Sequence, residues 1–334
     1  MRLATFNLES LDLPRGGEAA LSRRIAVLAP LLNRLRADVL CLQEVNARKG
    51  EGRQAGGQRR PTALQRLLNA SDYAGHSLTV SRSLSGDGPA DVHNLALVSR
   101  FPVLALRELR NDLVPPRRYA AVTAVPPEAG DLTLAWDRPL LYCLLELPGG
   151  GRLHVINLHL RSPLAAPIPG QKMGAQKIGG QKGAPPVWSS VAGWAEGLLA
   201  ATIMRSGQAL EARLLVEEIF DADPAALVAV CGDLNAGVEE TPGRILRAAV
   251  EDSGNPALAS RALYALEQTL PIERRHTVIH AGRPLMLDHL LVSQSLRQCF
   301  TGIEALNDAL PDEEEMAEDD PRSNHAPLVA AFDL

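Results

Sequence analysis

Strand-like apolar runs bordered by polar side chains are the feature that most constrains the fold of this chain. The run Leu227-Val228-Ala229-Val230-Cys231 is costly to expose to water, and its residue types favour a buried strand. Polar residues that follow such strands would emerge at one edge of a sheet. Carboxylates, amides and imidazoles gathered there are typical of a metal-assisted hydrolytic site. Polar sets border apolar runs in this way at Asn7, Gln43-Glu44, Asn157-Leu158-His159, Asp233-Leu234-Asn235, Asp288-His289 and Ser323-Asn324-His325.

Hydrophobic periodicity predicts a mixed α/β chain. Apolar residues at helical spacing predict helices over 18–35, 61–68, 189–220 and 242–250, the third broken near Gly197 or Gly207. A hairpin is expected from 277–280 and 286–292, around Ala281-Gly282-Arg283. Many strands with few helices suggest two mixed sheets packed face to face with helices outside, a four-layer α-β-β-α sandwich. The other expected strands are 3–8, 38–43, 95–99, 103–109, 119–125, 140–147, 153–160, 227–231 and 326–332.

Composition bounds the class of protein. The chain has 334 residues, of which 46% are hydrophobic, and this is ample for a large core. Because the polar sets run from end to end and one site needs all of them, we expect a single domain over 1–334. No apolar run reaches the length of a membrane span, and a strand beginning at residue 3 leaves no room for a signal peptide. The four cysteines (Cys41, Cys143, Cys231 and Cys299) show no CxxC spacing, which favours reduced thiols in a cytoplasmic protein.

The net charge of −5 is distributed unevenly. Basic residues dominate 45–60 and 161–183, directly after Glu44 and His159, which favours phosphate attraction at the rim of the site. The second stretch belongs to a Gly/Gln/Lys-rich loop at 163–186. This loop is either a flexible surface segment or a lid that grips phosphate, and the sequence favours neither. Its three repeated Gln-Lys pairs contain Lys172, Lys177 and Lys182, the loop lysines hereafter.

Two further segments favour structural interpretations. The acidic run 312–320 is expected to be a solvated loop. Trp188 and Trp194 are expected to anchor a helix in the core rather than to stack on bases.

Taken in order, the polar sets resemble those of the endonuclease/exonuclease/phosphatase superfamily, the metal-dependent phosphodiesterases of the pancreatic-deoxyribonuclease type. The resemblance runs from Asn7 to His325. It is closest to the bacterial nuclease branch in the last third, at Leu287-Asp288-His289-Leu290-Leu291-Val292-Ser293, Asn307-Asp308-Ala309-Leu310-Pro311-Asp312-Glu313 and Ser323-Asn324-His325-Ala326-Pro327. It implies the four-layer sandwich, with the site at one end of the sheets.

Metal ligation is expected first at Glu44. A glutamate at the end of an apolar strand is costly to bury without a partner, and Mg²⁺ prefers carboxylate oxygen, with Mn²⁺ able to substitute. Asn7 offers a neutral amide that can orient Glu44, a metal-bound water or phosphate. Asn324 stands where the family usually has an aspartate. It keeps one acceptor oxygen but loses the charge, which puts its role as a metal ligand in doubt.

The resemblance also implies the catalytic roles. Asp233 would position or deprotonate the attacking water, and Asn235 would donate to the phosphate. His159 would contact the phosphate or act as an acid. His325 would donate to the scissile phosphate while Asp288 holds its ring in the correct tautomer. His289 follows Asp288, points to the other side of the strand and is interpreted as structural.

These observations predict a Mg²⁺-dependent phosphodiesterase, first of all a DNA nuclease, with no membrane and no obligate protein partner. The choice between endonuclease and exonuclease stays open. One alternative is a phosphatase or phospholipid phosphodiesterase of the same fold, against which counts the lack of an evident apolar docking loop. A second is a non-catalytic phosphate-binding module. Only Asn324 favours it.

Overall fold

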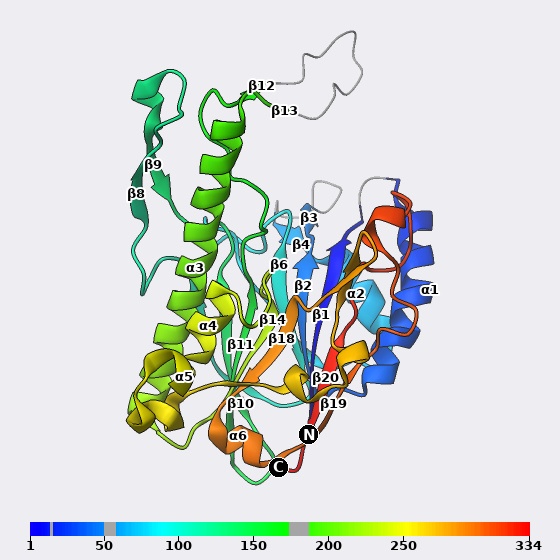
Figure 1. Ribbon diagram of the computed structural model, residues 1–334. Coiled ribbons are helices and arrows are strands. Elements are labelled where there is room, and N and C mark those ends of the chain that lie inside the picture. The colour runs from blue at the N-terminus through cyan, green and yellow to red at the C-terminus, as the bar shows by residue number, and fades with distance from the viewer. Residues whose placement is uncertain (14–15, 50–57, 174–186) are drawn as a thin grey trace.

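The computed structural model describes residues 1–13, 16–49, 58–173 and 187–334. These residues form two six-stranded sheets that face each other, with helices on the outer sides (Figure 1). The first sheet has the order β19 (Phe300–Ala305), β20 (Leu328–Phe332), β1 (Arg2–Leu11), β2 (Val39–Val45), β6 (Asn94–Ser99), β5 (Ser77–Val80). The second has the order β15 (Tyr264–Ala265), β18 (Asp288–Val292), β14 (Leu227–Asp233), β11 (Arg152–His159), β10 (Leu140–Glu146), β7 (Val103–Leu109).

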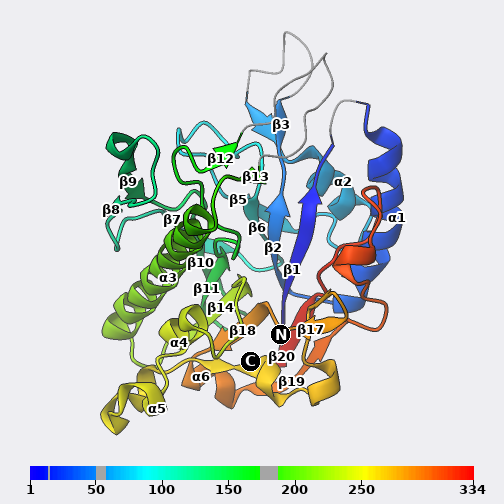
Figure 2. The ribbon, with the colours of Figure 1, turned by 45° about the horizontal axis from the view of Figure 1, so that its top comes forward.

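Helices cover both outer faces, as Figure 2 shows. The first sheet is covered by α1 (Glu18–Leu35) and α2 (Thr62–Asn69), and the second by α3 (Val191–Ala222) and α4 (Thr241–Arg247). The short helical elements are α5 (Val250–Ser253), α6 (Gln294–Gln298) and the 3₁₀ turns η1 (Pro127–Gly130), η2 (Pro256–Arg261), η3 (Leu266–Thr269), η4 (Ile272–Arg274) and η5 (Glu313–Glu315). Short strands also pair two by two: β3 (Arg48–Lys49) with β4 (Arg59–Arg60), β8 (Arg117–Ala120) with β9 (Asp131–Leu134), β12 (Lys172–Met173) with β13 (Val187–Trp188), and β16 (Val278–His280) with β17 (Arg283–Leu285).

The core follows from side-chain alternation along the strands. Leu3 of β1 faces the second sheet and packs in a cluster with residues such as Cys143 and Cys231, whereas Phe6 faces α1 and packs with Leu28. A third cluster lies between the second sheet and α3. Three apolar layers between four layers of elements confirm the predicted sandwich. The thiols of Cys41, Cys143 and Cys231 are buried and unpaired.

Several element predictions were correct and others were wrong. Helix α1 has the predicted bounds, but the segment predicted as a strand over 119–125 is extended only to Ala120. The predicted hairpin partner 286–292 was wrong, because β16 pairs instead with β17 (Arg283–Leu285), whereas β18 (Asp288–Val292) joins the second sheet. The helix predicted over 242–250 ends at Arg247, because Ala248 takes a left-handed conformation.

Helix α3 is continuous over 32 residues, so the predicted break at Gly197 or Gly207 was wrong. Both glycines allow close packing instead. A Cβ on Gly197 would lie 2.4 Å from the carbonyl oxygen of Ala166, and one on Gly207 would lie 2.8 Å from the Trp136 ring. The helix continues through both glycines, and at each of them the missing side chain leaves room for a close neighbour.

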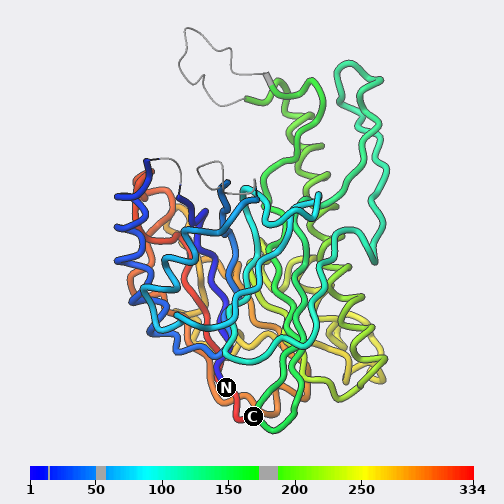
Figure 3. Tube along the Cα trace, turned by 180° about the vertical axis from the view of Figure 1, so that it is seen from behind, coloured from blue at the N-terminus to red at the C-terminus, as the bar shows by residue number. Residues whose placement is uncertain are grey.

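The first half of α3, the β8–β9 hairpin and the β12–β13 pair form an arm that extends beyond the ends of the sheets, as Figure 3 shows from behind. The arm exposes apolar side chains, including Val122 at 89% and Val191 at 81%. Trp194 is 45% exposed, so its predicted role as a core anchor was wrong. Among the helices of the described residues, none combines the length and apolar character that crossing a membrane requires.

Candidate active site

The sequence-predicted polar residues meet at one end of the two sheets. Strand register places Asp233 opposite Asp288 on one side and opposite His159 on the other. Asn7 comes from β1 in the facing sheet, and its Nδ2 donates to Asp233 Oδ2 at 3.0 Å. The two sheets therefore both contribute to one cluster of polar side chains. The contact between Asn7 Nδ2 and Asp233 Oδ2 is visible only in the folded structure.

The turn after β14 positions Asp233. Gly232 has φ +135°, and a Cβ there would lie 1.9 Å from the carbonyl oxygen of Leu158, so only glycine fits. Asn235, also left-handed, donates its backbone N–H to Asp233 Oδ1 at 2.7 Å. Its side-chain Nδ2 donates to the Leu160 carbonyl at 3.0 Å and lies 3.4 Å from Asp233 Oδ2. In this arrangement Asn235 holds the carboxylate, and its amide hydrogens are already engaged.

Asp233 and His325 have strongly shifted pKa values. Burial and the neighbouring Asp288 charge raise the pKa of Asp233 to about 6. Burial opposes the protonated form of His325, but the Asp288 charge and hydrogen bond, with Asp233 and Glu44, outweigh it and raise its pKa to about 10. His325 Nδ1 donates to Asp288 Oδ2 at 2.7 Å, and His325 Nε2 lies 3.9 Å from Asp233 Oδ2. At neutral pH a protonated imidazole thus stands beside a largely ionised carboxylate.

His159 carries the opposite protonation state. Burial, and then the charges of Arg138, His93 and His325, hold its pKa well below the usual range. Arg138 Nη1 lies 2.6 Å from His159 Nε2, so the neutral ring accepts at Nε2. Arg138 was missed by sequence reasoning. The antiparallel pairing of Leu141 with Asn157 could have placed it beside His159.

Glu44 sits in a strained, well-bonded position. It has φ +57°, and its Oε2 accepts from both the N–H and the hydroxyl of Ser10 at 3.0 Å. Its Oε1 lies 3.3 Å from Asn7 Nδ2 and 3.8 Å from His159 Nε2. His93, a second residue missed from sequence, lies 3.8 Å from Oε2. Glu44 is therefore held at the point where both sheets meet.

Asn324 lies among carboxylates. Its backbone N–H donates to Glu9 Oε2 at 2.8 Å, and its Nδ2 donates to Glu313 Oε2 at 3.1 Å. Its Oδ1 is shielded and has no hydrogen-bond partner in the described part of the chain. Burial raises the pKa of Glu9, and the negative charge of Glu44 adds to this rise. Glu9, two residues after Asn7, was not predicted, and it places a carboxylate beside the residue that lacks the family's charge.

Other predicted residues lie apart from this centre. His289 is buried and bonds to Glu267 Oε1 at 2.6 Å and to the Ala236 carbonyl at 2.9 Å, behind the Asp233 turn. Among the loop lysines, Lys172 is exposed with its Nζ 4.9 Å from the Trp188 ring centroid. Lys177 and Lys182 lie outside the described residues, as does most of the loop predicted over 163–186.

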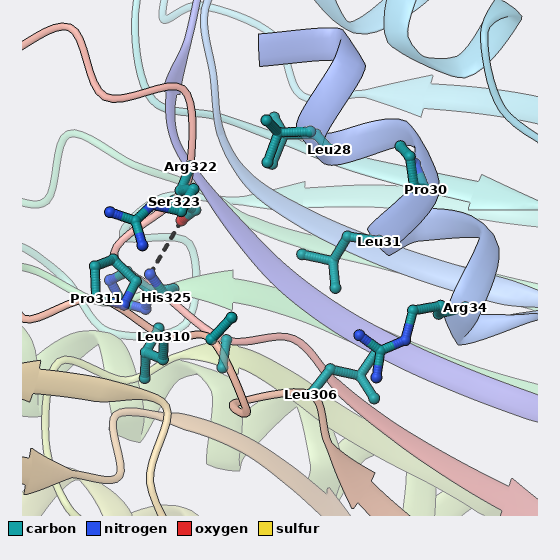
Figure 4. Close-up of a pocket in the computed structure, with 13 residues that line it drawn as sticks. Leu28, Pro30, Leu31, Arg34, Leu306, Leu310, Pro311, Arg322, Ser323 and His325 are labelled. Carbon is teal, nitrogen blue, oxygen red and sulfur yellow. Dashed lines mark hydrogen bonds between the residues drawn. The ribbon is translucent and has the colours of Figure 1, made fainter. Parts of the chain in front are cut away.

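An apolar cavity of about 250 Å³ lies between α1 and the loops around Leu310 and Ser323 (Figure 4). His325 also lines it, and its backbone N–H donates to Ser323 Oγ, drawn as the dashed line. The two arginines at its edge, Arg34 and Arg322, already pair with Asp308 and Asp320. The lining of the cavity is therefore mainly apolar, and both of its arginines face acids.

Comparison with known proteins identifies the family. The sequence profile of the endonuclease/exonuclease/phosphatase family matches residues 4–310. The chain belongs to this family. No curated protein sequence matches it.

Solved structures of other proteins of this family share the fold of this chain. Truncated TDP2 from Caenorhabditis elegans aligns with a TM-score of 0.55 at 16% identity, over 99% of this chain and 96% of that one. An endonuclease/exonuclease/phosphatase family protein from Leptotrichia buccalis gives 0.54 at 13% identity, over the full length of both. An AP endonuclease from Archaeoglobus fulgidus gives 0.50 at 16% identity, again over both full chains. At these identities the likeness concerns the fold alone.

Proposed function

We propose that this chain is a divalent-metal-dependent phosphodiesterase that hydrolyses DNA. The observation that carries the proposal is the pairing of opposite protonation states at one site. His325 is a proton donor at neutral pH, and Asp233, 3.9 Å away, is a proton acceptor. Hydrolysis of a phosphodiester needs an acceptor for the proton of the attacking water and a donor at the phosphate, and this pair supplies both.

The residues present fit a hard divalent cation. Glu44 and Glu9 offer carboxylate oxygens whose charges act on each other, and Asn324 Oδ1 is a shielded oxygen without a partner among the described residues. Magnesium sites of this kind use one or two carboxylates with water and phosphate completing the shell. Glu44, with Glu9, Asn7 and Asn324 around it, would hold the ion. When bound, the ion would neutralise charge on phosphate oxygens.

A second acidic group, Asp233, Asp288 and His325, also has ligand atoms within 4.8 Å of one another. In this group His325 Nδ1 donates to Asp288 Oδ2, the Asp233 oxygens accept from Asn7 and Asn235, and Asp288 Oδ1 has no partner among the described residues. We assign this group to proton transfer rather than to the metal, because the His325 pKa of about 10 keeps the ring protonated and a metal-bound imidazole must be neutral.

Each polar side chain then has a role of its own. Asp233, held by Asn7 and Asn235, takes the proton of the attacking water. His325 donates from Nε2 to the phosphate while Asp288 holds Nδ1. Because His159 Nε2 accepts from Arg138, the phosphate contact on this side comes from the Arg138 guanidinium, which His159 orients.

DNA is the substrate best supported. Arg59 and Arg60 on β4 and Lys49 on β3 add positive charge after Glu44, and the neighbour from Archaeoglobus fulgidus is named an endonuclease. One observation favours the lipid alternative. The arm beside the site exposes Val122, Val125 and Val191, apolar surface that the sequence had not indicated.

The deciding experiment is an activity panel on the purified protein with Mg²⁺, Mn²⁺ or excess chelator. Its substrates are plasmid DNA, single-stranded DNA, RNA and sphingomyelin vesicles. We expect metal-dependent DNA cleavage, lost by several orders of magnitude in Glu44→Ala. Glu146→Gln is the matched control, since this exposed glutamate ends β10 at the opposite end of the second sheet. Full activity in chelator would refute the metal mechanism, and DNA binding without cleavage would support the non-catalytic alternative.

A further inference from the structure

Two arginines and a glutamine beside the active site have shielded side-chain nitrogens without a partner among the described residues. Arg205 is only 7% exposed, and its Nε and Nη1 are shielded and without a hydrogen-bond partner in the described part of the chain. The same holds there for Nε of Arg161 and Nε2 of Gln208, a residue that is 1% exposed. Four shielded donor nitrogens in this cluster therefore have no acceptor among the described residues.

These side chains lie together. Arg205 and Gln208 are three residues apart on α3 and so share a face of the helix. Gln208 Oε1 accepts the backbone N–H of Arg161 at 2.8 Å, which fixes the loop after β11 against α3. Burial lowers the pKa of Arg205, Glu240 raises it, and the Arg161 charge lowers it. Arg161 and Arg205 therefore both adjoin Gln208, one through a hydrogen bond and the other through the helix face.

The cluster adjoins the catalytic centre. Arg161 is two residues after His159, and the carbonyl of the intervening Leu160 accepts from Asn235 Nδ2 at 3.0 Å. Among the described residues, Glu240 makes no hydrogen bond to the shielded Nε or Nη1 of Arg205, and its Oε1 accepts from the backbone N–H of Gly237. Shielded guanidinium nitrogens that lack an acceptor in the described part of the chain cost stability, and such a cost at a functional edge is typical of a site built for an anion.

We propose that Arg161, Arg205 and Gln208 form a second phosphate-binding subsite, which holds a phosphate of the substrate next to the scissile one. The guanidinium fork matches two phosphate oxygens, and the Gln208 amide can donate to a third. The proposal rests on the proposed function and extends it: the preferred substrate carries at least two phosphates in a row, as a polynucleotide does. A substrate with a single phosphate would leave this subsite empty.

Binding of inorganic phosphate in excess chelator tests the subsite without catalysis. Thermal unfolding is followed at constant ionic strength, with chloride as the reference anion. We expect phosphate to stabilise the wild type and Arg205→Met to bind phosphate about tenfold more weakly or worse. Without phosphate, Arg205→Met should melt above the wild type, because the variant removes an unpaired buried charge. Arg161→Met, at a less buried position, should lose phosphate affinity as well.

Arg213→Met is the matched control on the same helix. Arg213 is equally buried at 6% exposure, but its guanidinium pairs with Glu217 and donates to the carbonyls of Leu246 and Arg261. This variant should melt below the wild type and keep its phosphate affinity. Undiminished phosphate binding in Arg205→Met, or the absence of phosphate stabilisation in the wild type, would overturn the subsite.

Two substrates separate this proposal from the proposed function. Arg205→Met should lower kcat/KM about tenfold for a deoxythymidine hexanucleotide and leave it unchanged for bis(p-nitrophenyl) phosphate, which has one phosphate. Equal losses on both substrates would count against a second subsite. If the wild type cleaves neither substrate, the proposed function fails, while the phosphate-binding result still decides the subsite.

Discussion

Asp288→Asn is the change that probes the proposed proton transfer most directly. Asp288 is fully buried and accepts from His325 Nδ1 at 2.7 Å. Asparagine has nearly the same size and keeps one acceptor oxygen, but it lacks the charge. The substitution therefore tests the electrostatic role of the carboxylate with little change in packing.

The size of the expected change follows from the shift in the pKa of His325. A rise in pKa from 6.5 to about 10 corresponds to roughly 5 kcal/mol of preference for the protonated ring. Asp288 provides the largest favourable part of that preference, ahead of Asp233 and Glu44. Without its charge, burial opposes protonation with less compensation. We expect the pKa of His325 to fall by about two or more pH units.

Both limbs of the pH–rate profile should move in the same direction. In the wild type the rate rises as Asp233 ionises, near pH 6, and is lost as His325 deprotonates, near pH 10. The Asp288 charge raises both pKa values, so its removal lowers both. The bell-shaped profile should shift to lower pH, and kcat at pH 8 should fall about twofold if the pKa of His325 drops by two units, about tenfold if it drops by three and about 100-fold if it drops by four.

NMR titration of the His325 ring in the metal-free protein measures the pKa directly, and the pH dependence of kcat/KM follows the limbs. Glu267→Gln is the control, because this buried acid bonds to His289, the residue next to Asp288, on the other side of the strand. It should lower stability and leave both limbs in place. A His325 pKa unchanged in Asp288→Asn would refute the assignment of the acid.

Three further changes test other parts of the site. Gly232→Ala forces a Cβ to within 1.9 Å of a backbone carbonyl oxygen, so denaturant unfolding should show a loss of about 3 kcal/mol or more, and a loss below about 1 kcal/mol would contradict this. Asn324→Asp replaces the donor to Glu313 with a charge, so the metal-free protein should melt lower and half-maximal activity should need less Mg²⁺; identical metal titrations would separate residue 324 from the metal. Replacing the three loop lysines by alanine should lower the salt slope of oligonucleotide binding by about one for each lost phosphate contact, whereas an unchanged slope would exclude such contacts.

Much of the architecture was predictable because it depends on local pattern. Helix α1 has a regular apolar face and was predicted with its observed bounds. The apolar runs became the central strands of both sheets, and the polar residues at their ends came together at one end of the sandwich. The continuous helix α3 was not predicted. Its glycines are filled by neighbours from distant segments, Ala166 and Trp136, which no local pattern shows.

The sequence by itself determined the sandwich, the family resemblance and the set of Asn7, Glu44, His159, Asp233, Asp288 and His325. Only the tertiary structure decided what these groups can do. Protonation depends on burial and on charges a few ångströms away, which are contributed by residues far apart in the chain. For that reason His159 is neutral beside Arg138 while His325 is charged beside Asp288. For the same reason the sequence did not indicate Glu9 or Arg205. That Arg205 Nε and Nη1 lack a hydrogen-bond partner among the described residues can be seen only in the folded structure.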